Sequence, residues 1–386
     1  MRTCSTLRRS DLGYPPFVPL KRTLILIGAL LSVLAFLMFR TPAPVEGRNA
    51  PLRLSDREFW EMSSTMSEAD GTFHSENLVS NEADFQRLIP SLEKAAVPGR
   101  VYLGVGSEQN FSYIAAVRPS FAMIVDVRRG NLDLHLLYKA VFELSADRAD
   151  FVSRLFSRPR PAGLTRDSSA AAIFAAFAAV APSRTLYTSN LAEVESHLTK
   201  THGFALTAGD REGLAFVYGA FFTQGPDIHY ELNTGGFGRR GPGGLPSYAD
   251  LMTGADANGR NHSYLASGAS FAVVKDLEAR NLIVPVVGNF GGAKALRSVA
   301  SYLRRTGQTV SAFYVSNVEQ YLRQDGIWEQ FCRNAGSLPV DGSSVFIRSV
   351  RGGFGGAGGG FGGPRGGGFG LSLVPLAHDV AACAAR

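Results

Sequence analysis

A strand, a glycine turn, a helix and a second strand follow one another in residues 101–127, and this unit constrains the fold more than any other feature. The sequence VYLGVG (101–106) is a short apolar run that ends in glycine, and FAMIVDV (121–127) is a second apolar run. Between them, Phe111 and Ile114 recur at helical spacing. Two strands joined by a helical crossover lie parallel in one sheet. The sequence therefore predicts a βαβ unit.

The same order of elements returns near the C-terminus. NLIVPVVGNF (281–290) is an apolar run, residues 291–307 have helical periodicity, and TVSAFYVS (309–316) is a further apolar run. Residues 157–280 are mostly helical in pattern and separate the two units. We therefore expect an α/β fold, with a Rossmann-like, mostly parallel sheet, helices on both faces and a helical insert.

The N-terminal region has the pattern of a membrane anchor. Residues 23–39 hold 17 consecutive uncharged residues, with Lys21 and Arg22 before them and Arg40 after them. This length is at the lower edge for a transmembrane helix, which needs about 20 residues. A cleaved signal peptide is the alternative interpretation. Five basic residues precede the segment and four follow it by residue 57, a bias that favours a cytoplasmic N-terminus.

The chain thus divides into segments of different composition. Thirteen of the 43 glycines lie in residues 351–370, which cannot bury a core and are expected to be disordered. We expect a single-pass membrane protein whose soluble domain lies on the outer, periplasmic or extracellular side. The predicted segments are a basic N-terminus at 1–22, a membrane anchor at 23–39, a linker at 40–66, a Rossmann-like domain at 67–350, the glycine-rich segment and a C-terminal tail at 371–386.

The charge distribution excludes a basic nucleic-acid-binding body. The chain has a net charge of +6, but residues 1–40 carry +5 and residues 341–386 carry +2. Residues 41–340 are left with a net charge of −1. Nucleic-acid binding is therefore an unlikely function for the main domain. The sequence defines no oligomeric state.

Metal binding is not indicated either. The three cysteines have no CxxC spacing, and the seven histidines form no HxxxH or HxH pair. His197 and His202 are five residues apart and have no carboxylate partner at metal spacing. We therefore predict no metal site.

The strongest candidate for ligand binding is the glycine turn after the first strand. Gly104 and Gly106 allow the backbone to approach a ligand, and the following helix directs N–H groups towards it. Asp126 ends the second strand, 22 residues after Gly104, where an acidic side chain can bind a ribose diol. The third glycine of a dinucleotide fingerprint is replaced by Gln109. An ordinary βα turn with a surface aspartate is the competing interpretation.

Further polar residues follow the predicted strands. In open α/β sheets, ligands bind outside the carboxyl ends of the strands, so we expect a small-molecule ligand at this edge. Helix capping is the alternative role, above all for Asn317. The candidate cofactor-binding residues are Gly104, Gly106, Glu108, Asn110, Asp126 and Arg128, and the candidate substrate edge is Asn289, Asn317 and Tyr321.

These residues carry a resemblance to a known superfamily. VYLGVGSEQNFSYIAAVRPSFAMIVDVRR resembles the first motif of class I S-adenosylmethionine-dependent methyltransferases, followed by the acidic end of their second strand. Longer stretches over about 67–322 resemble a bacterial family of unknown function built on that fold. The resemblance implies S-adenosylmethionine as cofactor, bound through Gly104, Gly106 and Asp126. Taken together with the predicted membrane contact through residues 23–39, we expect a membrane-anchored, methyltransferase-like protein whose acceptor is unknown.

Two departures keep other functions open. Tyr102 stands where the superfamily often has an acidic residue, and the (Asp/Asn)-Pro-Pro-(Tyr/Phe) motif of amino-group methylation is absent. One alternative is a non-catalytic binding or scaffold module on a Rossmann-like fold. Another is a Rossmann-like enzyme that uses a different nucleotide ligand.

Overall fold

A six-stranded sheet forms the centre of the structure. The computed structural model describes residues 52–230, 232, 245–351 and 369–384. The strand order is β3-β2-β1-β4-β5-β6, in which the first five strands are parallel and β6 is antiparallel to β5. The α/β class and the mostly parallel sheet are therefore confirmed. The strands are β1 (Val101–Gly104), β2 (Phe121–Asp126), β3 (Ile283–Val287), β4 (Val310–Ser316), β5 (Val345–Arg351) and β6 (Phe369–Pro375).

The first four strands coincide with the four apolar runs of the sequence. Every residue of β2 and β3 is buried, as expected for parallel strands with helices on both faces. Pro285 is unusual in a strand because it has no N–H to donate to a neighbour. It is tolerated here because β3 is the edge strand and pairs only with β2, where Pro285 lies opposite Ile124.

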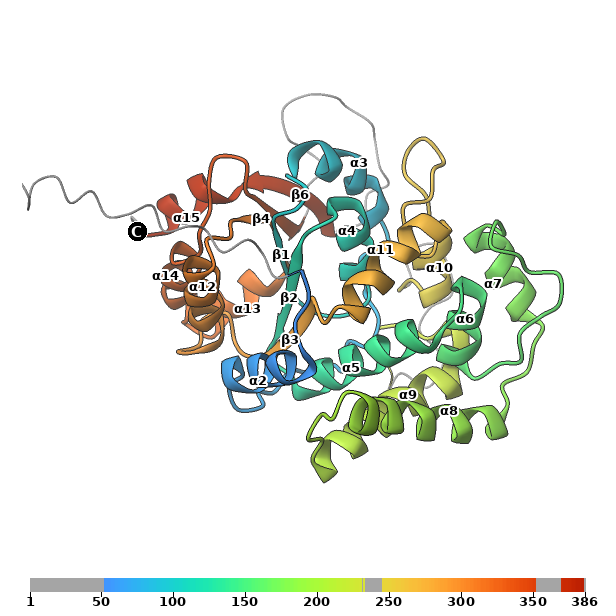
Figure 1. Cartoon of the computed structure of the whole chain (residues 1–386). Coiled ribbons are helices and arrows are strands. Elements are labelled where there is room, and N and C mark those ends of the chain that lie inside the picture. The colour runs from blue at the N-terminus through green and yellow to red at the C-terminus, as the bar shows by residue number, and fades with distance from the viewer. Residues whose placement is uncertain (1–51, 231, 233–244, 352–368, 385–386) are drawn as a thin grey trace, which may run out of the picture. The chain divides into compact units, whose positions relative to one another are not determined.

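Helices cover both faces of the sheet (Figure 1). The helices α3, α4, α5 and α11 lie on one face, and α12, α14 and α15 lie on the other, while α2 packs beside β3. In α12, Leu296, Val299 and Leu303 are buried at helical spacing, which seats this helix against the sheet. The bounds are α2 (Asp56–Met66), α3 (Phe85–Ala95), α4 (Gln109–Val117), α5 (Arg129–Leu144), α11 (Gly268–Ala279), α12 (Ala295–Arg305), α13 (Val318–Gln324), α14 (Trp328–Gly336) and α15 (Leu376–Ala384).

The predicted insert is helical, and apart from α11 its helices lie beyond α5 rather than on the sheet, with α8 and α9 in contact with α5 (Figure 1). The helix α5 is followed by a break at Ser145 and then by α6. The helices of the insert come after α6. The helix α9 lies along α5, and α8 lies beside α9. The bounds are α6 (Arg148–Phe156), α7 (Ala170–Ala178), α8 (Arg184–Ser196), a π-helical turn (His197–Thr201), α9 (Ala208–Gln224), a 3-10 turn (Gly225–Asp227) and α10 (Tyr248–Thr253).

Two segments differ from the predicted organisation. The expected linker at 40–66 contains α2, whose first turn is closed by a capping box between Ser55 and Glu58. The expected tail at 371–386 instead supplies most of β6 and the whole of α15, and a disulfide between Cys332 and Cys383 joins α14 to α15. The folded domain therefore begins before residue 67 and extends beyond residue 350.

Two predictions fall on parts of the chain that the structure does not describe. The predicted anchor at 23–39 lies outside the described residues, as do residues 352–368 of the glycine-rich segment. Among the described residues, no helix combines the length and the apolar character that crossing a membrane requires.

Candidate functional site

A pocket opens at the carboxyl ends of the parallel strands. The strand order reverses between β1 and β4, and ligands of open α/β sheets bind at such a switch point. The pocket has a volume of about 140 Å³ and opens to solvent. Residues that follow β1, β2, β3 and β4 all line it. The expected ligand edge is thus a concave surface in the folded protein.

The glycine turn after β1 forms one wall of this pocket. Gly106 lines the pocket and has a φ of +77°, a conformation that favours glycine. Its carbonyl oxygen is 2.8 Å from Nε2 of His135, which fixes the turn against α5. Gly104 lies behind the wall, where a Cβ would overlap the side chain of Asn110. The two glycines therefore have different roles, one at the pocket and one in packing.

Asn110 supports the turn from inside the protein. Its Nδ2 donates to the carbonyl oxygens of Val105 at 2.9 Å and Ser107 at 2.8 Å. The hydroxyl of Tyr102 donates to its Oδ1 at 2.8 Å. Tyr102, which replaces the acidic residue common in the resembling superfamily, thus belongs to the same buried network. Asn110 holds the turn in shape and does not line the pocket.

Glu108 also points away from the pocket. Its side chain is completely buried, and Oε1 accepts a hydrogen bond from the backbone N–H of Ser80 at 3.2 Å. Burial raises the pKa of Glu108 to about 7, since the charged form loses its hydration. The prediction that Glu108 contacts a cofactor therefore finds no support in its position, which is the protein interior.

Asp126 and Arg128 line the pocket as an ion pair. Oδ1 of Asp126 accepts from the backbone N–H and from Nε of Arg128, both at 3.0 Å, and Oδ2 accepts from Nη2 at 2.9 Å. Both side chains are less than one-tenth exposed. The guanidinium also lies 5.9 Å from the centre of the Phe73 ring. The end of β2 thus presents a fixed, partly neutralised pair of charges to the pocket.

The predicted substrate edge also lies in this pocket. Asn289, Asn317 and Tyr321 all line it. Oδ1 of Asn289 accepts from the backbone N–H of Gly291 at 2.9 Å. Asn317 is the residue before α13, but its side chain makes no capping hydrogen bond. The capping role expected as the alternative for Asn317 is therefore absent.

The irregular segment 67–84 forms a wall that the sequence did not predict. Phe73 and Asn77 of this segment line the pocket, and Phe73 packs edge-on against Tyr321 with ring centres 5.0 Å apart. Tyr230, from within the insert, closes another part of the wall. The segment has no helical or alternating pattern, so periodicity could not place these residues. Its aromatic and amide side chains were the only available signal.

A buried glutamate anchors this segment below the pocket. Glu82 accepts hydrogen bonds from Nε2 of Gln109 at 2.6 Å, the Tyr314 hydroxyl at 2.9 Å and Ser316 Oγ at 2.8 Å. Burial raises its pKa, and these donors lower it in part. Glu82 thus connects the segment to α4 and β4. Gln109, Tyr314 and Ser316, which line the pocket, therefore share one buried hydrogen-bond partner.

The fold and the pocket define an α/β protein with a pocket at the switch point of its sheet. A family model described as "Domain of unknown function (DUF7790)" matches residues 77–205 and 239–363, and the chain belongs to this family. No curated protein matches the chain. The matched ranges include β1, β2, β3 and β4, whose ends line the pocket, and they carry no assigned reaction.

Proposed function

We propose that the pocket binds a nucleoside-containing small molecule, with S-adenosylmethionine as the first candidate. The observation that carries this proposal is that Gly106 and Asp126 line one pocket at the switch point of the sheet. Gly106 exposes backbone to the ligand, and Asp126 is placed to accept hydrogen bonds from a ribose. Aromatic side chains such as Phe73 and Tyr321 offer surfaces on which a base can stack.

The ion pair limits how Asp126 can bind a ribose. A carboxylate has about four lone-pair positions, and Arg128 donates to three of them. One position is left for a ribose hydroxyl while the ion pair is intact. A ribose diol that donates twice requires Arg128 to release one hydrogen bond. We therefore propose that Arg128 is the side chain that adjusts when a ribose diol binds.

Methyl transfer is the reaction that we propose for this ligand. S-adenosylmethionine supplies an electrophilic methyl group when it is bound. The protein's contribution would be to orient donor and acceptor and to exclude water, because such catalysis rests largely on proximity. Asn289, Asn317 and Tyr321 line the same pocket and would contact the acceptor. A non-catalytic binding module would keep the same pocket and bind the ligand without turnover.

A phosphorylated nucleotide is the second candidate ligand. Arg128 brings a guanidinium to the pocket, and guanidinium groups bind phosphate through paired hydrogen bonds. In this case the ligand's phosphate would compete with Asp126 for the Arg128 donors. The first candidate ligand would therefore bind the Asp126 carboxylate of this ion pair, and the second would bind its Arg128 guanidinium.

A thermal-shift panel on the purified full chain separates these candidates. The probes are S-adenosylmethionine, S-adenosylhomocysteine, adenosine, ATP and NAD. A ligand at 100 times its Kd stabilises the folded state by about 2.7 kcal/mol, which a melting curve resolves. A rise with the two S-adenosyl compounds supports the first candidate, and a rise with ATP or NAD alone supports the second. No rise with any probe refutes nucleoside binding.

Matched variants connect the shift to the pocket. Asp126→Asn removes the charge that the ribose proposal needs. Asp276→Asn is the control, because Asp276 is exposed on α11 and its ion-pair partner in the described part of the chain is Arg280. The control should keep the full shift, and Asp126→Asn should lose it.

We also propose that the domain lies outside the cytoplasm. The disulfide between Cys332 and Cys383 supports this, since structural disulfides persist mainly in oxidising compartments. The pattern of residues 23–39 fits the same location.

The location can be tested with an impermeant thiol reagent on intact cells. Single cysteines are introduced near residue 45 and in the C-terminal tail, and the native cysteines are replaced. Labelling at the tail supports an outer location, and protection overturns it. An outer domain would lack the cytoplasmic supply of S-adenosylmethionine and of nucleotides alike, so protection of the tail would strengthen both candidate ligands.

A further inference from the structure

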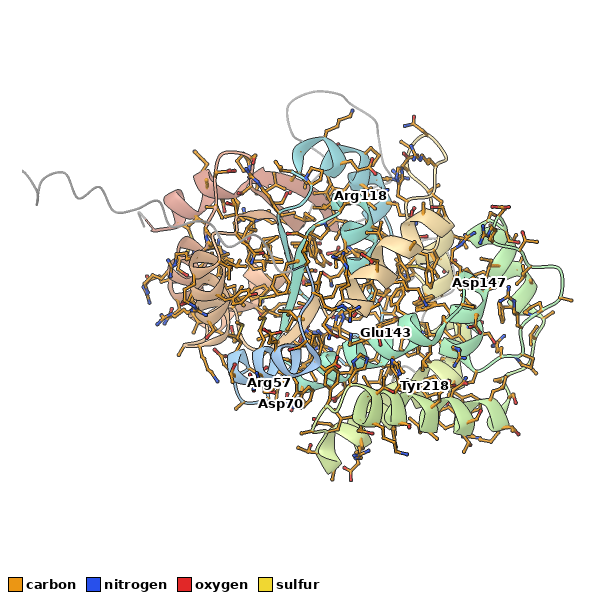
Figure 2. All side chains as sticks on the ribbon, viewed as in Figure 1. Arg57, Asp70, Arg118, Glu143, Asp147 and Tyr218 are labelled. Carbon is orange, nitrogen blue, oxygen red and sulfur yellow. A yellow bond between two sulfur atoms is a disulfide. The ribbon has the colours of Figure 1, made fainter. Side chains whose placement is uncertain are left out.

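A second polar cluster lies at the far end of α5 from the pocket. It consists of Glu143, which Figure 2 labels on α5, together with His197 and His202 from the segment after α8. Nε2 of His197 and Nε2 of His202 are each 2.6 Å from the same oxygen, Oε2 of Glu143. Fourteen residues separate Arg129, which begins α5, from Glu143, a distance of about 21 Å along the helix. The cluster is therefore separate from the pocket.

A π-helical turn brings the two histidines together. In an α-helix, five residues rotate the chain by about 140° beyond one full turn, so His197 and His202 would point in different directions. The chain here forms a π-helical turn at His197–Thr201, closed by a hydrogen bond from the His202 N–H to the His197 carbonyl at 3.1 Å. Their ring centres are 4.8 Å apart. Such turns are rare and are frequent at functional sites.

Glu143 is the carboxylate partner that the sequence did not reveal. It is 54 residues from His197 and 59 from His202 along the chain, so no local spacing could connect them. The absence of a metal site was predicted from local spacing alone. In the folded chain, one carboxylate oxygen and two imidazole nitrogens lie within 4.8 Å of one another.

The groups around the cluster orient its ligand atoms. Nδ1 of His202 is 2.6 Å from Oδ1 of Asp56, an arrangement in which a carboxylate holds the ring and leaves Nε2 for a metal. Lys139 donates to the other oxygen of Glu143, Oε1, at 2.7 Å, so only Oε2 faces the imidazoles. Two carboxylates, Glu143 and Asp56, lie beside two ammonium groups, Lys139 and Lys275, and Nζ of Lys275 is 3.1 Å from the carbonyl oxygen of Glu143. With neutral imidazoles these charges balance, so a divalent cation would enter a site with no net charge.

The spacing fits a metal ion after a small adjustment. Zinc binds imidazole nitrogen and carboxylate oxygen at about 2.0–2.2 Å, which places neighbouring tetrahedral ligands about 3.4 Å apart. The two imidazole nitrogens are now each 2.6 Å from the carboxylate oxygen. The side chains would separate by about 0.8 Å to admit the ion.

We propose that Glu143, His197 and His202 bind one divalent first-row transition metal, with Zn²⁺ as the favoured ion. Two imidazoles and one carboxylate suit Zn²⁺ and leave one tetrahedral position for water. The ion connects α5 to the segment after α8, and Asp56 connects it to α2. Its role is to hold the insert against the sheet domain. The proposal is independent of the nucleoside ligand.

The test uses the untagged full chain, stripped of metal with chelator and titrated by calorimetry with ZnCl₂ and with CoCl₂. We expect one equivalent of Zn²⁺ to bind, and Co²⁺ to give the intense visible absorption of a four-coordinate site. His197→Asn and Glu143→Gln should abolish both signals. Asp56→Asn should keep the stoichiometry and weaken binding by about 10–100-fold, as expected for a residue that orients a ligand.

A matched control exists in the same chain. His262 is paired with Asp256 at 3.0 Å and is largely buried, yet it belongs to no such cluster among the residues that the structure describes. His262→Asn should bind Zn²⁺ like the wild type. Circular dichroism identifies any variant that fails to fold. Because His197→Asn and Glu143→Gln each remove a different ligand, the test needs only one of them to fold. No binding by the folded wild type, or equal binding by the folded variants, overturns the proposal and leaves a buried ion-pair cluster.

Discussion

The packing of Gly104 against Asn110 predicts a specific energetic coupling. In Gly104→Ala, the new Cβ would overlap Oδ1 of Asn110 and would lie 3.0 Å from both Asn110 Cγ and Tyr102 Cε1. Asn110 cannot move away freely, because it makes three hydrogen bonds to Val105, Ser107 and Tyr102. The clash therefore falls on the network that shapes the turn at the pocket.

The size of the effect follows from these contacts. Overpacking of a buried site costs about 1–3 kcal/mol in the free energy of unfolding, which we expect for Gly104→Ala. Asn110→Ala removes three buried hydrogen bonds, at about 0.5–1.5 kcal/mol each, and should cost about 2–4 kcal/mol. In the double variant the main clash is gone. The double variant should therefore lose about 1–2 kcal/mol less free energy of unfolding than the two single variants lose together.

The assay is urea unfolding of the full chain in mild detergent, followed by the fluorescence of Trp60 and Trp328. Each variant gives a free energy of unfolding, and the four values close a double-mutant cycle. Gly213→Ala provides a second test of the principle, since its Cβ would overlap the side chain of Asp133. Additive costs for Gly104→Ala and Asn110→Ala, within about 0.5 kcal/mol, would refute the reasoning.

Two further predictions concern buried groups. Burial raises the pKa of Glu108 from 4.5 to about 7, so the folded chain keeps a proton that the unfolded chain loses. As the pH rises from 4.5 to about 7, the free energy of unfolding of the wild type should therefore fall by roughly 3 kcal/mol relative to that of Glu108→Gln, measured in urea. The same pH dependence in both proteins would contradict this. Replacement of Cys332 and Cys383 by serine opens a 51-residue loop and should cost about 4 kcal/mol. An unchanged urea midpoint against the oxidised wild type would count against a structural disulfide.

The core of the fold was predictable because it depends on local apolar pattern. The runs at 101–106, 121–127, 281–290 and 309–316 became four parallel strands, since strands buried on both faces are apolar throughout. The fifth strand, Val345–Arg351, includes Arg348 and Arg351 and lacks such a run. Its pairing with β6 joins segments on either side of the glycine-rich segment, which no local pattern could indicate.

The site was predictable only in part, for a related reason. Gly106 and Asp126 line the pocket because strand ends in a parallel sheet meet at one edge. Glu108 and Asn110 lie in the same stretch of sequence but point inward, and this depends on the direction of each side chain from the start of α4. The segment 67–84 and the pair of His197 and His202 depend on tertiary contacts and on an irregular helical turn.

The most direct test of the account is calorimetric titration of the purified full chain with S-adenosylhomocysteine, with Asp126→Asn and Asp276→Asn titrated alongside it. We predict saturable binding at one site per chain for the wild type and Asp276→Asn. We predict that Asp126→Asn, still folded by circular dichroism, loses at least tenfold in affinity, about 1.4 kcal/mol. Equal affinity for all three proteins would contradict a ribose contact at Asp126, and no binding by the wild type would contradict S-adenosylmethionine as the ligand of this pocket.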